Sequence, residues 1–133
     1  MEFLINDEAV LESYSRDASI FKVTPKYVSF PKNSGDIKKL VAYAKENGES
    51  LTARAAGTDM TGGPLNESII VDVAKYMNKI GEIEGESIRV EPGAYYRDFE
   101  KKTLEKGLLL PCYPASKDLC ALGGMVANNC GGE

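Results

Sequence analysis

Two glycine-rich segments carry residue types that suit the binding of a large anionic ligand. Residues 54–63 read Arg-Ala-Ala-Gly-Thr-Asp-Met-Thr-Gly-Gly, and residues 122–132 read Leu-Gly-Gly-Met-Val-Ala-Asn-Asn-Cys-Gly-Gly. Glycine lets the backbone approach a ligand and lets successive N–H groups point at it, because no Cβ intervenes. Lysine is absent from both segments. We therefore expect one elongated anion, for which a dinucleotide is the natural candidate, to be held mainly by main-chain amides.

The charge of the chain argues against several classes of partner. The 133 residues include 16 Lys and Arg against 20 Asp and Glu, a net charge of −4. Nucleic acids and acidic membrane surfaces call for clustered basic residues, so neither is expected. No apolar run approaches the roughly 20 residues of a membrane span, and the N-terminus lacks the features of a secretory signal. We expect a cytoplasmic protein without a transmembrane segment, which leaves peripheral membrane association of a full enzyme open.

The cysteines and the missing histidine limit the chemistry of the chain. Cys112, Cys120 and Cys130 form an odd set without paired spacing, and the sequence contains no histidine. Free buried thiols are therefore the simpler interpretation, and a metal site is not expected. Histidine is the commonest general base, so its absence removes the usual catalytic arrangements. The sequence by itself identifies no catalytic residue.

The pattern that positions the first segment is strand–helix–strand–loop–strand. Residues 7–16 predict a short helix and residues 27–30 a strand, and a longer helix follows with Ser34 as N-cap and Gly48 at its end. Ile37, Leu40, Val41 and Ala44 give that helix one apolar face. Residues 51–53 and 68–73 predict two more strands, the second buried on both faces. A parallel crossover unit is the economical interpretation.

The pattern changes after Tyr76. Residues 84–87 predict a turn, and residues 88–91 alternate apolar and polar as a strand with one wet face does. A helix is expected over residues 95–106, with Tyr96, Phe99 and Thr103 on its buried face, and a short helix within residues 118–129. We therefore predict one α+β domain with a parallel sublayer over about residues 1–76 and an antiparallel sublayer over about residues 77–133.

Each glycine segment also has a purely structural interpretation, and both interpretations stay open here. Residues 54–63 can form a tight connection between two strands, although ten residues is long for a simple link. Neither segment is a Walker loop or a Rossmann fingerprint. Residues 111–116 are either an extended connector or a wall with room for a flat ring. Asn128 and Asn129 can bond an amide-rich ring or cap the last helix.

Asp59 conflicts with a pyrophosphate in the first segment. A carboxylate 4 Å from phosphate is repelled by about 4 kcal/mol at an effective dielectric constant near 20. We therefore expect the Asp59 side chain to point away from phosphate while its N–H points inward. An ordinary ion pair between Arg54 and Asp59 is the simpler interpretation of these two charges, and contact of Arg54 with phosphate is the alternative.

Taken in order, the motifs resemble those of a known family. Residues 14–19, 54–63, 90–93 and 111–116, the last followed by residues 122–132, are similar to the FAD-binding domain of the vanillyl-alcohol oxidase / p-cresol methylhydroxylase superfamily. The flavoprotein D-lactate dehydrogenase and glycolate oxidase large-subunit branch resembles the chain most. The resemblance covers nearly the whole chain and implies an incomplete PCMH-type fold, with N–H groups of the first segment on the FAD pyrophosphate.

The resemblance also implies a set of cofactor-binding residues spread over both segments. They are Arg54, Ala56, Gly57, Thr58, Asp59, Met60, Thr61, Gly62, Pro114, Ser116, Leu122, Gly123, Gly124, Ala127 and Asn128. The chain departs from the family where Ala55 and Ala56 replace glycines and where Ala121 replaces a threonine. Family members that bond flavin covalently commonly use histidine, so we expect noncovalent FAD here.

The resemblance further implies that the chain is the N-terminal fragment of a longer enzyme. In the intact enzyme, hydride would pass from C2 of a D-2-hydroxy acid to flavin N5, with the substrate bound by a missing domain. An alditol oxidase or a reductase of cell-wall precursors are alternatives of the same fold. A further alternative is a non-catalytic folded module that holds no flavin by itself. An unpaired sheet edge in the fragment would favour self-association.

Overall fold

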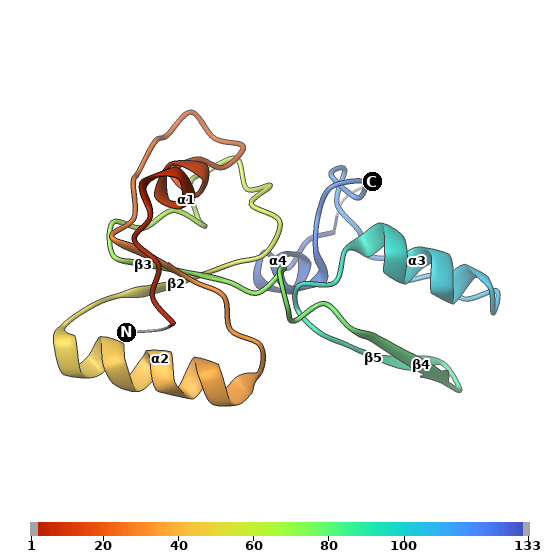
Figure 1. Cartoon of the computed structure of the whole chain (residues 1–133). Helices are drawn as coiled ribbons and strands as arrows, with labels where there is room; N and C mark the ends of the chain where they lie inside the picture. Colours follow the sequence, from red (N-terminus) through yellow and green to blue (C-terminus); the bar gives the residue numbers. More distant parts are fainter. Residues whose placement is uncertain (1–2, 132–133) are drawn as a thin grey trace.

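The computed structural model describes residues 3–131 and shows two groups of elements side by side (Figure 1). A parallel sheet with two helices forms the first group, and a hairpin with two helices forms the second. Gly132, in the second glycine segment, lies outside the described residues. The elements are α1 (Glu8–Ser13), β1 (Tyr27–Ser29), α2 (Ser34–Asn47), β2 (Leu51–Arg54), β3 (Ile69–Asp72), β4 (Ile80–Glu84), β5 (Ser87–Val90), α3 (Tyr96–Leu104) and α4 (Leu122–Ala127).

The first sheet has the strand order β1-β3-β2, and both pairs are parallel. Ile69 of the central strand lies opposite Tyr27 on one side and Leu51 on the other. Every residue of β3 is buried, as the continuous apolar run predicted. The predicted parallel arrangement is thus confirmed, and it places the end of β2, where the first glycine segment begins, beside the end of β3.

Helix α2 covers the sheet with part of its predicted apolar face. Leu40 is 1% exposed and packs in one cluster with Ile69 and Val71, and Ala44 is also buried. Val41 was expected on the same face, but its side chain is 53% exposed, so that expectation was wrong. The reason is the short sheet: three strands of three or four residues cover only the Leu40–Ala44 stripe of a 14-residue helix.

The caps of α2 differ from expectation at one end. Asn33, not Ser34, is the N-cap, and its side-chain oxygen accepts the Asp36 N–H at 3.1 Å. Asparagine caps a helix as well as serine does. The first helical residue is therefore Ser34, one residue earlier than predicted. At the other end Gly48 takes φ 66° and terminates the helix, as expected.

The second group begins with the antiparallel pair β4 and β5, which confirms the predicted change of pattern. Gly85, at φ 63°, makes the turn between the two strands. Helix α3 buries Tyr96, Phe99 and Thr103, as predicted. Their core also contains Leu122 and Met125 of α4, so the second glycine segment is tied into this half of the molecule.

Three helices are shorter than the sequence predicted. Asp7 caps α1, which spans Glu8–Ser13 rather than residues 7–16, and α3 ends at Leu104. Helix α4 starts only at Leu122, because Ala121 pairs with Tyr95 in an antiparallel bridge and stays extended. Gly123 and Gly124 therefore lie inside a helix and not in a loop before it, whereas Gly131 follows the helix.

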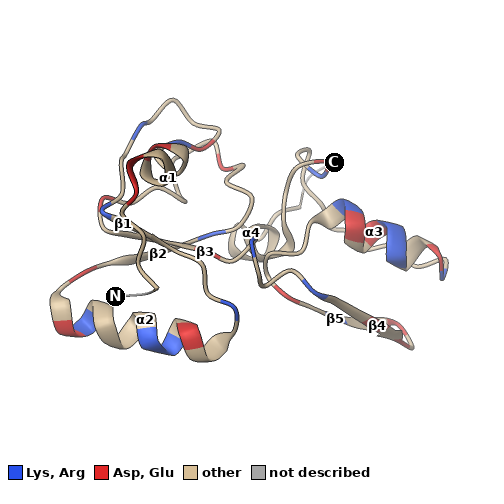
Figure 2. Ribbon diagram, viewed as in Figure 1, with Lys and Arg blue, Asp and Glu red and all other residues tan. Residues whose placement is uncertain are grey.

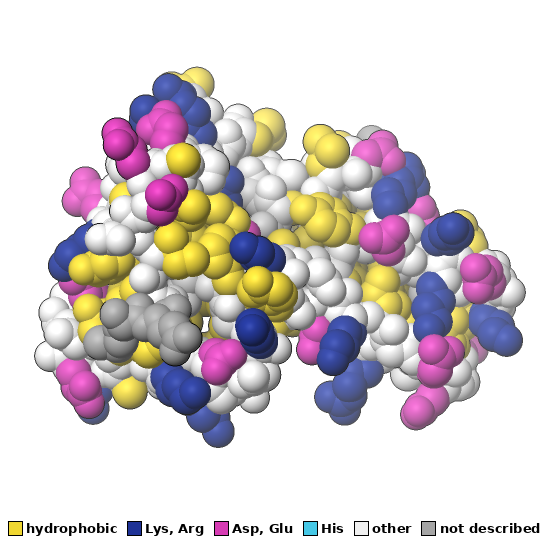
Figure 3. Space-filling model, viewed as in Figure 1, with side chains coloured by type: hydrophobic (Ala, Val, Ile, Leu, Met, Phe, Trp, Pro, Cys, Tyr) yellow, Lys and Arg dark blue, Asp and Glu magenta, His cyan; other side chains and the backbone are white. Residues whose placement is uncertain are grey.

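Gly93 joins the two groups of elements. Its N–H donates to the Met77 carbonyl at 2.8 Å, and a Cβ built on it would lie 2.2 Å from the Val73 carbonyl oxygen. Charged residues of both signs are spread over α2 and α3, whereas α4 carries none (Figure 2). The face in Figure 3 likewise mixes both signs. Within residues 3–131, no helix is long and apolar enough to cross a membrane.

Candidate functional site

A cavity of about 240 Å³ lies between the first glycine segment and α4. In Figure 1 the blue α4 lies between the parallel sheet and α3, at the junction of the two groups. Small and uncharged residues dominate the lining, and Asp59 is its one charged member. The lining residues are Ala53, Ala55, Ala56, Gly57, Thr58, Asp59, Gly63, Pro64, Pro114, Ser116, Cys120, Ala121, Gly124, Met125, Ala127, Asn128 and Cys130.

The first segment presents unpaired main-chain donors to this cavity. It leaves β2 after Arg54, and Gly57 takes φ 69°, a conformation that other residues adopt only with strain. The backbone N–H groups of residues 55–59 donate to no acceptor among residues 3–131. Backbone donors are obligatory hydrogen-bonding groups, so these five are satisfied by solvent or by a ligand. Successive free N–H groups of this kind suit an anion.

Arg54 does not line the cavity but anchors the start of the first segment to residues 14–16. Its guanidinium donates to the Arg16 carbonyl at 2.7 Å and to the Tyr14 carbonyl at 3.4 Å. It also lies over the Tyr14 ring, 5.2 Å from the centroid. The expected ion pair between Arg54 and Asp59 is absent from residues 3–131. Two backbone carbonyls and a ring compete successfully for this cation, because they are already fixed by the fold.

The Tyr14 side chain that receives Arg54 is itself anchored to the sheet. Its hydroxyl donates to the Asp72 carboxylate at 2.5 Å, and Asp72 ends the central strand β3. Burial first, and then this hydrogen bond, raise the pKa of Tyr14. The phenol therefore stays protonated and keeps donating at neutral pH. In this way residues 14–16 fix Arg54, and Arg54 fixes the start of the glycine segment.

Asp59 folds its carboxylate back onto its own loop. One oxygen accepts the Thr61 N–H at 2.5 Å, the Thr61 hydroxyl at 2.6 Å and, more weakly, the Gly63 N–H at 3.4 Å. These bonds, the Thr61 hydroxyl first, lower the pKa of Asp59, and the Asn128 side chain adds to the effect. Asp59 is therefore ionised at neutral pH, and its carboxylate is bonded within its own segment.

The glycines of α4 have two different roles. A Cβ on Gly123 would lie 2.7 Å from the Pro92 carbonyl oxygen, so this glycine permits close packing against the residues before α3. A Cβ on Gly124 would meet nothing within 4 Å, and Gly124 lines the cavity. Gly124 is thus the glycine whose missing side chain leaves room for a ligand.

Two of the three cysteines line the same cavity, and the three differ in exposure. Cys120 is buried, Cys130 is partly buried, and both line the cavity. Burial raises the pKa of the Cys120 and Cys130 thiols, which are therefore neutral. Cys112 was expected to be buried but is exposed, and its thiol donates to the Cys130 carbonyl. Among the described residues, no group of three metal-ligating side chains is assembled.

The structure separates the residues expected to bind a cofactor into two sets. The residues that line the cavity are Ala56, Gly57, Thr58, Asp59, Pro114, Ser116, Gly124, Ala127 and Asn128. The residues that do not line it are Arg54, Met60, Thr61, Gly62, Leu122 and Gly123. Met60 is 79% exposed and Leu122 is in the core, whereas Thr61 bonds Asp59. For both sets, contact with a cofactor stays a prediction.

Several lining residues were not among those expected. They are Ala53, Ala55, Gly63, Pro64, Cys120, Ala121, Met125 and Cys130. Most are small, and most are direct sequence neighbours of expected residues. Small size next to a glycine segment was therefore the sequence signal for these lining residues. That Met125 lines the cavity follows only from the packing of α4.

The lining fits part of a flavin dinucleotide. Free N–H groups suit a diphosphate, and the open space over Gly124 suits a flat group. The volume of about 240 Å³ is below the ~300–1,000 Å³ of pockets that enclose a whole drug-sized ligand. The cavity therefore encloses one portion of such a ligand.

Comparisons with known proteins agree with this geometry. The FAD binding domain family matches residues 25–133. The chain is 32% identical over 123 residues to the glycolate oxidase subunit GlcD of Bacillus subtilis, covering 90% of this chain and 26% of that protein. It is 32% identical over 124 residues to the D-2-hydroxyglutarate dehydrogenase of Escherichia coli, covering 90% of this chain and 12% of that protein.

Solved structures show the same fold at lower identity. An alkyldihydroxyacetonephosphate synthase superposes with a TM-score of 0.82 at 19% identity, over 98% of this chain and 28% of that one. A cholesterol oxidase from Brevibacterium sterolicum superposes with a TM-score of 0.76 at 21% identity, over 88% of this chain and 24% of that one. The chain thus spans about a quarter or less of these proteins. It belongs to the FAD binding domain family, with the PCMH-type fold of flavin-dependent oxidoreductases and FAD as the cofactor.

Proposed function

We propose that this chain holds FAD noncovalently and serves an oxidoreductase that acts on a D-2-hydroxy acid of the lactate or glycolate type. The observation that carries the first part is the cavity between the glycine segments, with five unpaired N–H groups on one wall. The names of the relatives, glycolate oxidase subunit and D-2-hydroxyglutarate dehydrogenase, support the substrate class. The sequence has no histidine for a covalent link of the kind common in the family.

In this proposal the residues of the chain bind and orient the cofactor. The N–H groups of residues 55–59 hold the diphosphate, and Arg54 keeps them in place through Tyr14 and Arg16. Pro114, Ser116 and Gly124 form the wall along which the rest of the cofactor lies. FAD, when bound, supplies the two-electron acceptor. No residue of this chain is assigned to the chemical step.

A substitution at Gly124 tests the proposal. Gly124→Leu places a side chain in open space within the cavity, and it improves the helix propensity of α4. We expect the full chain to quench flavin fluorescence and to melt at higher temperature when FAD is added. Gly124→Leu should keep its melting temperature without FAD but lose both responses. Val126→Leu is the matched control, because Val126 is on the same helix, 81% exposed and outside the cavity.

Two results would contradict the proposal. If the wild-type chain neither quenches flavin fluorescence nor gains stability at high protein concentration, it is a folded module without its own flavin. If Gly124→Leu binds FAD as well as Val126→Leu does, the cofactor lies elsewhere. The substrate class is tested on the protein encoded by the complete gene: D-lactate, but not L-lactate, should bleach the flavin absorbance under anaerobic conditions.

A further inference from the structure

The formal charge in the cavity lining comes from one carboxylate, which accepts its hydrogen bonds from its own loop. Asp59 is the one charged lining residue, and no Lys or Arg of residues 3–131 lies within 4.0 Å of its carboxylate. Arg54, the nearest cation in sequence, is held by the carbonyls of Tyr14 and Arg16. The wall that offers N–H groups to an anion therefore also carries a negative charge that no Lys or Arg of residues 3–131 balances.

The donors of the first segment are divided between two uses. Thr61 and Gly63 give their N–H groups to the Asp59 carboxylate, whereas residues 55–59 keep theirs free. The N–H groups of Thr61 and Gly63, in the second half of the segment, are thus already used by the Asp59 carboxylate. An added phosphate would find donors only in the first half, and it would be repelled from the second.

We infer that Asp59 is a positioning residue that acts as an internal anion: it orders the second half of the loop and confines the diphosphate of FAD to the first half, at reduced affinity. This inference rests on the proposed function. A ligand with a further negative group near Asp59 is disfavoured, whereas hydroxyl and amide donors are accepted there.

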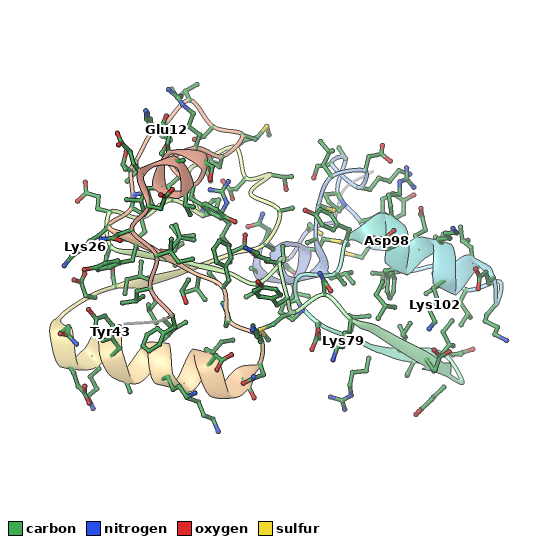
Figure 4. All side chains as sticks on the ribbon, in the orientation of Figure 1. Glu12, Lys26, Tyr43, Lys79, Asp98 and Lys102 are labelled. Carbon is green, nitrogen blue, oxygen red and sulfur yellow. The ribbon has the colours of Figure 1, made fainter. Side chains whose placement is uncertain are left out.

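The decisive variant is Asp59→Asn, which keeps the shape of the side chain and removes its charge. We expect FAD to bind roughly three- to tenfold more tightly, the effect of removing one partly screened charge several ångströms from a phosphate. Added salt should strengthen FAD binding to the wild type, because it screens the repulsion, and should do so much less for the variant. Asp98→Asn is the control, because Asp98 is exposed on α3, away from the cavity lining (Figure 4).

The ordering role has a readout that needs no flavin. In the wild-type chain without FAD, the Thr61 and Gly63 amides should exchange with solvent more slowly than in Asp59→Ala, measured by NMR. Unchanged exchange would overturn the ordering role. Equal or weaker FAD binding by Asp59→Asn, with unchanged salt dependence, would overturn the repulsion. If neither wild type nor variant binds FAD, the proposed function and the affinity effect both fail, while amide exchange still decides the ordering role.

Discussion

The two glycine segments face each other across one cavity, yet their glycines act differently. In the first segment Gly57 and Gly62 take φ values of 69° and 86°, in the left-handed region. In the second segment Gly123 and Gly124 lie in the right-handed helix α4. The first segment therefore needs glycine for its backbone conformation, whereas the second needs it for the absence of a side chain.

This difference explains how the two segments divide the site. Left-handed turns in the first segment break the pairing of the backbone and leave the N–H groups of residues 55–59 free. In α4 the first two N–H groups donate to the Ala94 and Pro92 carbonyls, and later ones donate within the helix. Glycine here gives close contact at Gly123 and empty space at Gly124. The first segment thus supplies hydrogen-bond donors, and the second leaves open space in the cavity at Gly124.

The largest expected effect is a difference in unfolding free energy between alanine substitutions at the neighbours Gly123 and Gly124. Gly123→Ala brings a Cβ within 2.7 Å of the Pro92 carbonyl oxygen and 2.8 Å of the Pro92 Cβ. Overpacking of this kind costs about 1–3 kcal/mol. Gly124→Ala should instead stabilise the chain by about 0.5–1 kcal/mol, because alanine is the better helix former. Urea unfolding of the three proteins measures both.

Equal effects of the two alanine substitutions would contradict the division of roles within α4. Val126→Ala serves as the control for helix propensity, because its exposed side chain lies on the same helix outside the cavity.

A smaller effect is expected at Gly57, for a different reason. Alanine at φ 69° costs about 1–2 kcal/mol. Its Cβ would also lie 2.6 Å from an Arg54 guanidinium nitrogen, so the guanidinium must shift relative to the Tyr14 and Arg16 carbonyls that hold it. We therefore expect a modest loss of unfolding free energy and a larger loss of FAD affinity, measured by urea unfolding and fluorescence titration. A stable Gly57→Ala chain with unchanged FAD affinity would show that the left-handed turn does not shape the donors.

Much of the fold follows from local patterns in the sequence. The apolar run of β3 predicted burial on both faces, and the alternation over residues 88–91 predicted the wet-faced strand β5. Gly48 predicted the end of α2, because only glycine takes the left-handed position easily. Small residues likewise predicted much of the cavity wall, since a ligand that lies close to backbone needs them.

What the sequence could not predict depends on contacts between distant residues. Arg54 and Asp59 are close in sequence and opposite in charge, yet Arg54 binds the Arg16 carbonyl, 38 residues away. Gly123 looked like part of a ligand loop, but its neighbour is Pro92, brought there by the Tyr95–Ala121 bridge. Charge and composition name the candidates for such contacts, and only the packed fold chooses among them.

The smallest expected effect is a pH dependence that belongs to the first segment alone. The hydrogen bonds from Thr61 and Gly63 lower the pKa of Asp59 below its ordinary value of 3.8, whereas the lining part of α4 has no acid to titrate. A lowered folded pKa means that the stabilisation is fully present above the unfolded pKa and is lost as pH falls through the folded one. The melting temperature of wild type should therefore exceed that of Asp59→Asn at neutral pH, and the gap should close in acid. Comparing the two proteins cancels the other carboxylates, because both contain them. A gap that stays constant from neutral to acid pH would mean that the Asp59 charge does not order the loop, and that the first segment, like the second, is shaped by backbone packing alone.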